Sequence, residues 1–160
     1  MRKQLLKTIA IGSLLLVVAI VPVRSAQAQT LANGIRAKIP FDFIVGDETL
    51  SAGDYYIYRT RQYSSDDVLT ISTVEGHVAA VRLTNGAQAL SPKEQSVLVF
   101  NRYGNKYFLS QVWIAGSNMG RVFLRSRSER ELERDVKSFA RLSGDKVPAT
   151  TTVSVVAGPQ

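Results

Sequence analysis

The chain has 160 residues, of which 45% are hydrophobic and 21% charged, a composition typical of one globular domain rather than two. Its formal net charge is +7, but four of these positive charges lie in the first 28 residues, which contain no acid, so the remainder carries +3. A charge of this size argues against a nucleic-acid partner. The absence of cysteine excludes disulfides, thiolate metal sites, thiol nucleophiles and a lipid-modified cysteine.

Residues 1–28 have the pattern of a secretory signal peptide. A basic start precedes an apolar run over residues 9–21, and the small residues of Ala26-Gln27-Ala28 then provide a cleavage site. The alternative is an uncleaved membrane anchor, but the run is shorter than the roughly 20 apolar residues that a spanning helix requires. We therefore expect cleavage near Ala28, a periplasmic or secreted mature chain, and no stable membrane span after cleavage.

A flexible lead-in is expected over residues 29–37, followed by a β domain over residues 38–144. Alternating apolar residues predict a half-buried strand from Lys38 to Val45, and Gly46-Asp47-Glu48 is expected to turn the chain. Ser51 to Asp54 forms the next expected turn. Further strands are expected at residues 55–60, 68–74, 77–84 and 121–124. Asn85-Gly86 is expected to end the strand at 77–84.

The clearest element is a hairpin from Val97 to Ile114. Two runs of β-branched and aromatic residues flank Gly104-Asn105, a pair that favours a two-residue turn. Period-2 alternation places large apolar groups on both faces of these strands. We therefore expect this hairpin at the centre of the sheet, covered on both sides.

The apolar period changes to a helical one after Ser126. Leu132, Val136, Phe139 and Ala140 recur at helical spacing, and they predict an amphipathic helix over residues 127–142. Two capping boxes are possible, Ser128 with Glu131 or Ser126 with Glu129, and Gly144 is a suitable C-terminal cap.

The remaining residues, 145–160, are expected to form either a flexible tail or a closing strand. The predicted fold is all-β: a single antiparallel β-sandwich or small barrel of about seven or eight strands, with one C-terminal helix covering an open edge or end.

The sequence offers little for catalysis or metal binding. His77 is the single histidine, and a transition-metal site there would need carboxylates alone. The chain lacks a G-x-S-x-G motif, and the acidic pairs Asp47-Glu48 and Asp66-Asp67 lack the ligand spacing of a calcium loop. Arginines between residues 121 and 134 alternate with acids, which predicts a solvated, internally paired helix. We expect no cofactor, no metal and no enzymatic activity.

Aromatic residues supply the candidate binding surface. The chain has more tyrosines than a small core accommodates with every hydroxyl paired, although tyrosines are also common on the outer faces of β-proteins. Two of them share one face of a predicted strand and could line a groove or a barrel mouth. The candidate surface consists of Tyr56, Tyr58, Tyr63, Tyr103, Tyr107 and Trp113.

Three stretches carry a family resemblance: Ile39 to Gly46 (IPFDFIVG), Leu50 to Tyr55 (LSAGDY) and Asn101 to Trp113, followed by the helix start at Ser126. The chain resembles a group of small, exported, uncharacterised bacterial proteins with an I-P-F-x-F-x-V-G … L-P-A-G-x-Y pattern. The resemblance covers most of the mature chain and implies export and a β-rich fold, without an activity or site residues. The chain departs from the pattern at Ser51, where proline is usual, which loosens the following turn through the unfolded state.

The expected function is that of an exported, non-enzymatic β module that binds an envelope protein or a cell-surface polymer. The alternative is a carrier that holds a small apolar ligand in a barrel cavity. A carrier requires an interior cavity, whereas a binding module should have a filled core and an exposed apolar or tyrosine-rich patch. An enzyme of unrecognised type would need ionisable groups converging in a cleft, most plausibly around His77.

Overall fold

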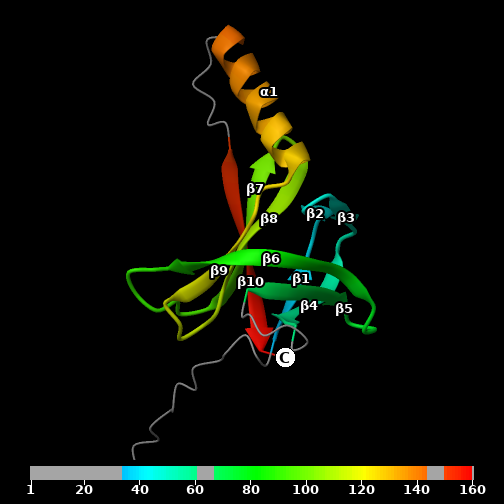
Figure 1. Cartoon of the computed structure of the whole chain (residues 1–160), viewed down its shortest axis with the longest axis vertical. Helices are drawn as coiled ribbons and strands as arrows, with labels where there is room; N and C mark the ends of the chain where they lie inside the picture. The colour runs from blue at the N-terminus through cyan, green and yellow to red at the C-terminus, as the bar shows by residue number, and fades with distance from the viewer. Residues whose placement is uncertain (1–33, 61–66, 144–149, 160) are drawn as a thin grey trace, which may run out of the picture.

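The computed structural model describes residues 34–60, 67–143 and 150–159 (Figure 1). In these residues the chain forms ten strands and one helix. They are β1 (Ile35–Ile39), β2 (Phe43–Val45), β3 (Glu48–Leu50), β4 (Gly53–Arg59), β5 (Val68–Thr73), β6 (Val78–Gln88), β7 (Ser96–Tyr103), β8 (Lys106–Trp113), β9 (Met119–Phe123), α1 (Arg127–Ser143) and β10 (Thr151–Pro159). The expected signal peptide, its cleavage site and the expected helix cap at Gly144 lie outside the described residues.

Eight of the strands close into an antiparallel barrel. Their order is β8-β7-β10-β1-β4-β5-β6-β9, and β9 pairs back onto β8 to complete the ring. The short hairpin of β2 and β3 joins outside this ring, where β2 pairs in parallel with β8. The all-β fold with one C-terminal helix is thus confirmed, and of the two expected architectures the chain adopts the barrel.

Aromatic side chains fill the interior of the barrel. Phe100 is fully buried and meets both Phe41 and Phe43 edge to face, at ring-centroid distances of 5.2 and 5.6 Å. Phe41 also stacks on Tyr107 at 4.0 Å, and Phe43 meets Tyr55 edge to face. An eight-stranded barrel is just wide enough for side chains to fill it, and Phe43, Tyr55 and Phe100 belong to its buried core, against which Phe41 and Tyr107 pack.

The end of the chain forms the strand that completes the barrel. β10 pairs with β7 from Thr151 to Ala157 and with β1 near Pro159. Of the two outcomes left open for residues 145–160, the closing strand is therefore correct for 151–159, whereas 144–149 lie outside the described residues. The β-branched TTTVSVV segment supports the pairing with β7, whereas β1 pairs with the residues that follow it, Ala157 to Pro159.

The strand expected from Lys38 to Val45 is two strands, so this prediction is wrong. β1 pairs with β4 and β10, whereas β2 pairs with β8 and β3, and the chain changes neighbours between them at Pro40. Proline has no N–H to donate to a sheet, which ends β1 at Ile39. β1 also begins at Ile35, inside the expected lead-in over 29–37.

Two expected turns are also corrected. Glu48 belongs to β3, so that only Gly46-Asp47 forms the turn after β2. The strand expected to end at Asn85-Gly86 continues to Gln88, because β6 leaves β5 and pairs with β9 over Thr84 to Gln88. This change of partner along one long strand helps the sheet to curve into a closed ring.

The hairpin expected from Val97 to Ile114 is present as β7 and β8. Tyr103 pairs with Lys106, and Gly104 has a φ of 61°, which fits a two-residue turn with glycine in the first central position. Ser110 is an extra residue in β8, because Val99 pairs with Gln111 and Phe100 pairs with Leu109. Such a bulge reverses the alternation of faces along β8.

Helix α1 begins at the expected residue but does not cover the barrel. Its cap is Ser126, whose Oγ accepts a hydrogen bond from the backbone N–H of Glu129 at 3.1 Å. The Glu129 carboxylate is buried and accepts hydrogen bonds from Asn101 Nδ2 at 2.8 Å and from the Tyr103 hydroxyl at 3.4 Å. Beyond this first turn the helix extends away from the barrel (Figure 1). The expectation that it covers an edge or an end is therefore wrong.

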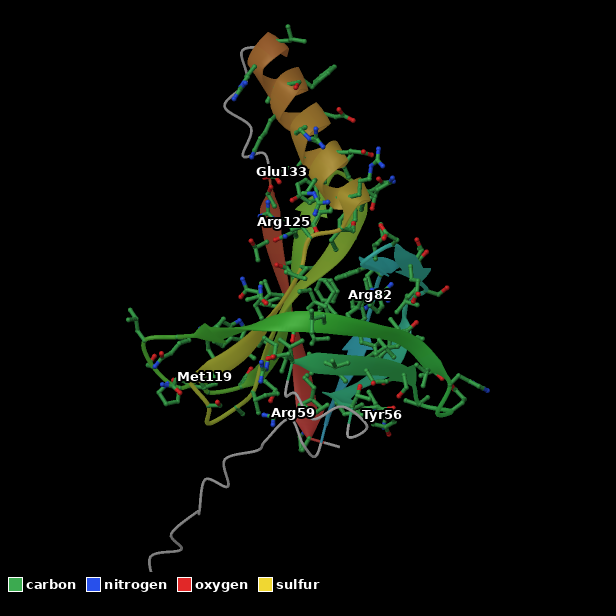
Figure 2. All side chains as sticks on the ribbon, in the orientation of Figure 1. Tyr56, Arg59, Arg82, Met119, Arg125 and Glu133 are labelled. Carbon is green, nitrogen blue, oxygen red and sulfur yellow. The ribbon has the colours of Figure 1, made fainter. Side chains whose placement is uncertain are left out.

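The β2–β3 hairpin is held by Arg82, which reaches across from β6 (Figure 2). Its Nη2 donates to the carbonyl of Val45 at 3.0 Å and lies 3.2 Å from Glu48 Oε1. The guanidinium also lies over Gly46, whose φ is 66°. A Cβ at Gly46 would overlap the guanidinium, whereas a Cβ at Gly104 meets nothing within 4 Å.

This difference provides a matched pair of variants. Gly104→Ala should lower the free energy of unfolding by about 1–2 kcal/mol through left-handed strain alone. Gly46→Ala introduces the same strain and also displaces Arg82, so its free energy of unfolding should fall by a further ~1 kcal/mol or more. Urea unfolding of both variants and of Arg82→Ala measures the difference. Equal losses for the two glycine variants would contradict the proposed role of Arg82.

Tyr103 makes the stability of the fold sensitive to alkaline pH. Burial raises the pKa of its hydroxyl, and the negative charges of Glu129 and Glu133 raise it further, against a hydrogen bond with Thr150 that lowers it. Because the folded chain retains a proton that the unfolded chain loses near pH ~10, stability is complete below that pH and falls as the pH rises through it. Tyr103→Phe should make this alkaline decline shallower in a series of urea unfolding curves. An unchanged decline would show that Tyr103 does not contribute to it.

Candidate functional site

The outward surface of β4, β5 and β6 carries a row of side chains with no charge among them. Strand pairing places Tyr56 beside Ser72, Tyr58 beside Thr70, and Val68 beside Leu83. These residues alternate with Ile57, Leu69 and Ile71, which point into the core, so they face outward. We name this surface the β4–β6 face. It consists of Tyr56, Tyr58, Val68, Thr70, Ser72, Val78, Val81 and Leu83.

The β4–β6 face combines apolar exposure with hydroxyl groups. Val78 is 60% exposed, Leu83 56% and Val81 40%, whereas Thr70 and Ser72 in the central strand are buried. Thr70 Oγ1 is hydrogen-bonded to Thr60 Oγ1. The outermost atoms therefore come from the two flanking strands, tyrosines on β4 and aliphatic side chains on β6. The central part of a protein–protein interface has a similar composition, rich in tyrosine and poor in charged residues.

Charged groups border this face on β1. The guanidinium of Arg36 lies 6.0 Å from the centroid of the Tyr56 ring and 3.3 Å from Asp54 Oδ1. A guanidinium at this distance from an aromatic face is at the outer limit of a cation–π contact. An uncharged centre with a charged margin is the arrangement expected of a docking patch.

The six residues proposed from the sequence do not gather at one place among those described. Tyr56 and Tyr58 lie together on the β4–β6 face. Tyr103 is buried beneath the start of α1, and Tyr107 is half-buried and stacks on Phe41 at the margin of the core. Tyr63 lies outside the described residues.

Trp113, the sixth of these residues, is only 9% exposed, and its contacts are with other residues of the fold. Its ring covers Gly120 on the neighbouring strand β9, and its Nε1 donates to Gln111 Oε1 at 2.8 Å. Lys93 Nζ lies 5.2 Å from the ring centroid. The ring thus fills the space that a glycine leaves open in the sheet, and its contacts account for its burial.

Sequence reasoning missed the aliphatic half of the β4–β6 face. Period-2 alternation assigns Val78 and Val81 to opposite faces of one strand. The structure contains a register shift in the pairing of β5 with β6, at Ile71 and Ser72, which brings both side chains to the outside. No residue type in β6 marks that shift, so nothing in the sequence could have found it.

Residues considered for chemistry have simpler roles. His77 is exposed in the turn between β5 and β6. Asp67 Oδ1 lies 2.6 Å from Arg121 Nη1, an ion pair that ties the start of β5 to β9, while Asp66 lies outside the described residues. In the ranges that the structure describes, no group of three or more His, Cys, Asp or Glu side chains is placed to hold a metal ion. The described part of the chain also has no helix long and apolar enough to cross a membrane.

The chain was compared with protein-family models, with curated proteins and with solved structures, and none of them matches it.

Proposed function

We propose that the protein is an exported, non-enzymatic β-barrel module that binds a partner protein of the cell envelope through the β4–β6 face. The observation that carries this proposal is the exposure of Val78, Val81 and Leu83 beside Tyr56 and Tyr58. Apolar side chains that lie exposed along one strand have a free-energy cost in water, and a partner that covers them removes this cost. The signal-peptide pattern of residues 1–28 supports an envelope location for that partner.

The interior of the barrel weighs against the carrier. A carrier for an apolar molecule needs space inside the barrel, where the buried rings of Phe43 and Phe100 pack edge to face and the partly buried Phe41 and Tyr107 pack against them. The face outside the barrel is therefore the better candidate for recognition. Its aliphatic row favours a protein over a polysaccharide, because sugars are bound by aromatic rings together with hydrogen-bonding side chains rather than by valine and leucine.

Site-specific photocrosslinking in an exporting bacterial host tests the proposal. A photoreactive residue at Leu83 should give a crosslinked protein of discrete mass, and Val81→Lys in the same chain should abolish it by burying a charge in the interface. Ser154, which is exposed on β10, is the matched position away from the face and should give no such product.

The same experiment has two contradicting outcomes. Identical crosslinked products from Leu83 and Ser154 would show that the protein contacts its neighbours without using the β4–β6 face in particular. A heterogeneous crosslinked product that is sensitive to glycan-degrading enzymes would identify the partner as a cell-surface polymer instead of a protein.

A further inference from the structure

The outer half of α1, residues 134–142, forms a second surface that the barrel leaves uncovered. Phe139 is 73% exposed and Leu142 is 88% exposed, although both are large apolar residues. The N-terminal turn is anchored by the buried Glu129, and the rest of the helix extends away from the sheet (Figure 1). Its tip is therefore apolar and exposed at one end of the molecule.

Four basic residues line one side of the same helix. Arg130, Arg134, Lys137 and Arg141 are spaced at i, i+4, i+7 and i+11, which places them on one face. We name this row the cationic stripe. It spans about 16 Å at 1.5 Å per residue.

The acids that alternate with this stripe in the sequence neutralise only one of its four members, Lys137. Glu129 is buried against Asn101 and Tyr103 of β7, and Glu131 pairs with Arg127 at 2.7 Å. Glu133 lies 2.7 Å from Lys137 Nζ and 2.6 Å from Arg125 Nη1 (Figure 2), and the hydrogen bond from Lys137 lowers the pKa of its carboxyl.

Within the described residues, Arg130, Arg134 and Arg141 have no carboxylate within ion-pairing distance. The guanidinium of Arg130 donates to the backbone carbonyl of Arg125, and that of Arg134 donates to the carbonyl of Arg130. These contacts position the side chains but leave their charges uncompensated.

We propose that the outer half of α1 docks on an anionic phospholipid surface. Phe139 and Leu142 enter the headgroup region, and the cationic stripe meets the lipid phosphates. A helix with a charged face rich in arginine and with phenylalanine and leucine elsewhere on its surface binds at a bilayer interface in this way. With about 3.6 residues per turn, the stripe lies on the side of α1 opposite to Phe139, so its long side chains meet the same surface as Phe139 and Leu142 only by reaching past the end of the helix.

An anionic lipid surface accounts for both features, whereas other partners account for one. A soluble polyanion would engage the cationic stripe but leave Phe139 and Leu142 in water. An apolar pocket on a protein would cover these two side chains but not the arginines. Asp135 lies on the same side of the helix as Leu142, two turns closer to the barrel. Its negative charge would face an anionic surface that lay along the whole helix, which favours contact through the tip.

This inference is independent of the proposed function. Strands β4, β5 and β6 lie in the part of the molecule farther from the tip of α1 (Figure 1). Docking through the helix therefore leaves the β4–β6 face accessible, and the barrel would present it away from the membrane.

Vesicle co-sedimentation of the exported chain tests the proposal. The chain should bind vesicles made of equal parts of phosphatidylglycerol and phosphatidylcholine, and should bind pure phosphatidylcholine much more weakly. Raising the salt concentration should weaken the binding because it screens exposed charges.

Two double variants separate the two contributions. Arg134→Gln with Arg141→Gln should weaken binding by roughly fivefold for each charge removed. Phe139→Ser with Leu142→Ser should weaken it by about tenfold or more. The matched controls are Lys38→Gln, an exposed cation on β1, and Val156→Ser, an exposed apolar residue on β10, and both should bind as the parent does. Leu83→Lys should also bind as the parent does, which separates this test from that of the β4–β6 face.

Three results would overturn the proposal. Equal binding to both kinds of vesicle would exclude recognition of anionic lipid. Unchanged binding by both double variants, with their unfolding curves intact, would exclude α1 as the docking element. Binding of soluble polyphosphate that is lost in the arginine variant but retained in the Phe139 and Leu142 variant would identify a polyanion in place of the lipid surface.

Discussion

Truncation of the chain before Thr151 should abolish cooperative folding. β10 lies between β7 and β1, so its removal exposes the backbone of both strands and opens the ring. It also removes Val155 and Ala157 from the core. We expect the truncated chain to lose its near-ultraviolet circular dichroism, to bind a hydrophobic dye and to aggregate.

A point variant on the same strand controls for this truncation. Val156 is 61% exposed on the outer side of β10, so Val156→Ser should change the free energy of unfolding by no more than about 0.5 kcal/mol. A truncated chain that still unfolds in one sharp transition, at the urea midpoint of the parent, would show that β10 does not close the barrel.

Replacement of Phe100 with alanine should lower the free energy of unfolding by about 3–5 kcal/mol, a large part of the total stability of a domain of this size. Phe100 is fully buried, and its removal leaves the rings of Phe41 and Phe43 without their edge-to-face partner. The interior of a closed barrel cannot collapse easily, because the strands around it are fixed by their neighbours. The resulting cavity should therefore remain largely open.

Phe139→Ala is the control for Phe100→Ala, because it makes the same chemical change at a residue that is 73% exposed. It should shift the free energy of unfolding by about 0.5 kcal/mol at most. Urea unfolding curves of the two variants measure both quantities. Similar losses at the two positions would contradict the assignment of Phe100 to the core and of Phe139 to the surface.

The sequence predicts those elements that local chemistry determines. Gly104-Asn105 between two runs of alternating residues identifies the β7–β8 hairpin, and Ser126 with a helical apolar period identifies the start of α1. Both depend on neighbours within a few residues, which a single sequence contains.

Long-range pairing decides the elements that were misjudged. Asn85-Gly86 has the chemistry of a turn, but β9 is available as a partner and the strand continues. The expected strand from Lys38 to Val45 ran through Pro40, because the separate partners of β1 and β2 could not be foreseen. Whether residues 151–159 would pair depended on two strands far away in the chain.

The candidate surfaces likewise contain features that local sequence predicts and features that depend on long-range pairing. The shared face of Tyr56 and Tyr58 follows from period-2 alternation, whereas the exposure of Val81 and Leu83 depends on which side of the sheet became the core. On α1 the acids and arginines seemed balanced in the sequence. The expected internal pairing is present in Arg127–Glu131 and Glu133–Lys137, whereas Glu129 is removed from it because it is buried against Asn101 and Tyr103 of β7.

Native mass spectrometry of the protein purified from an exporting host tests most directly whether the protein binds a partner on the outside of a filled barrel. We predict the mass of the bare polypeptide beginning at Gln29, alone or with a protein partner that Leu83→Lys releases. A small-molecule increment that disappears on denaturation and survives in Leu83→Lys would contradict this account. It would show that the barrel interior carries a ligand.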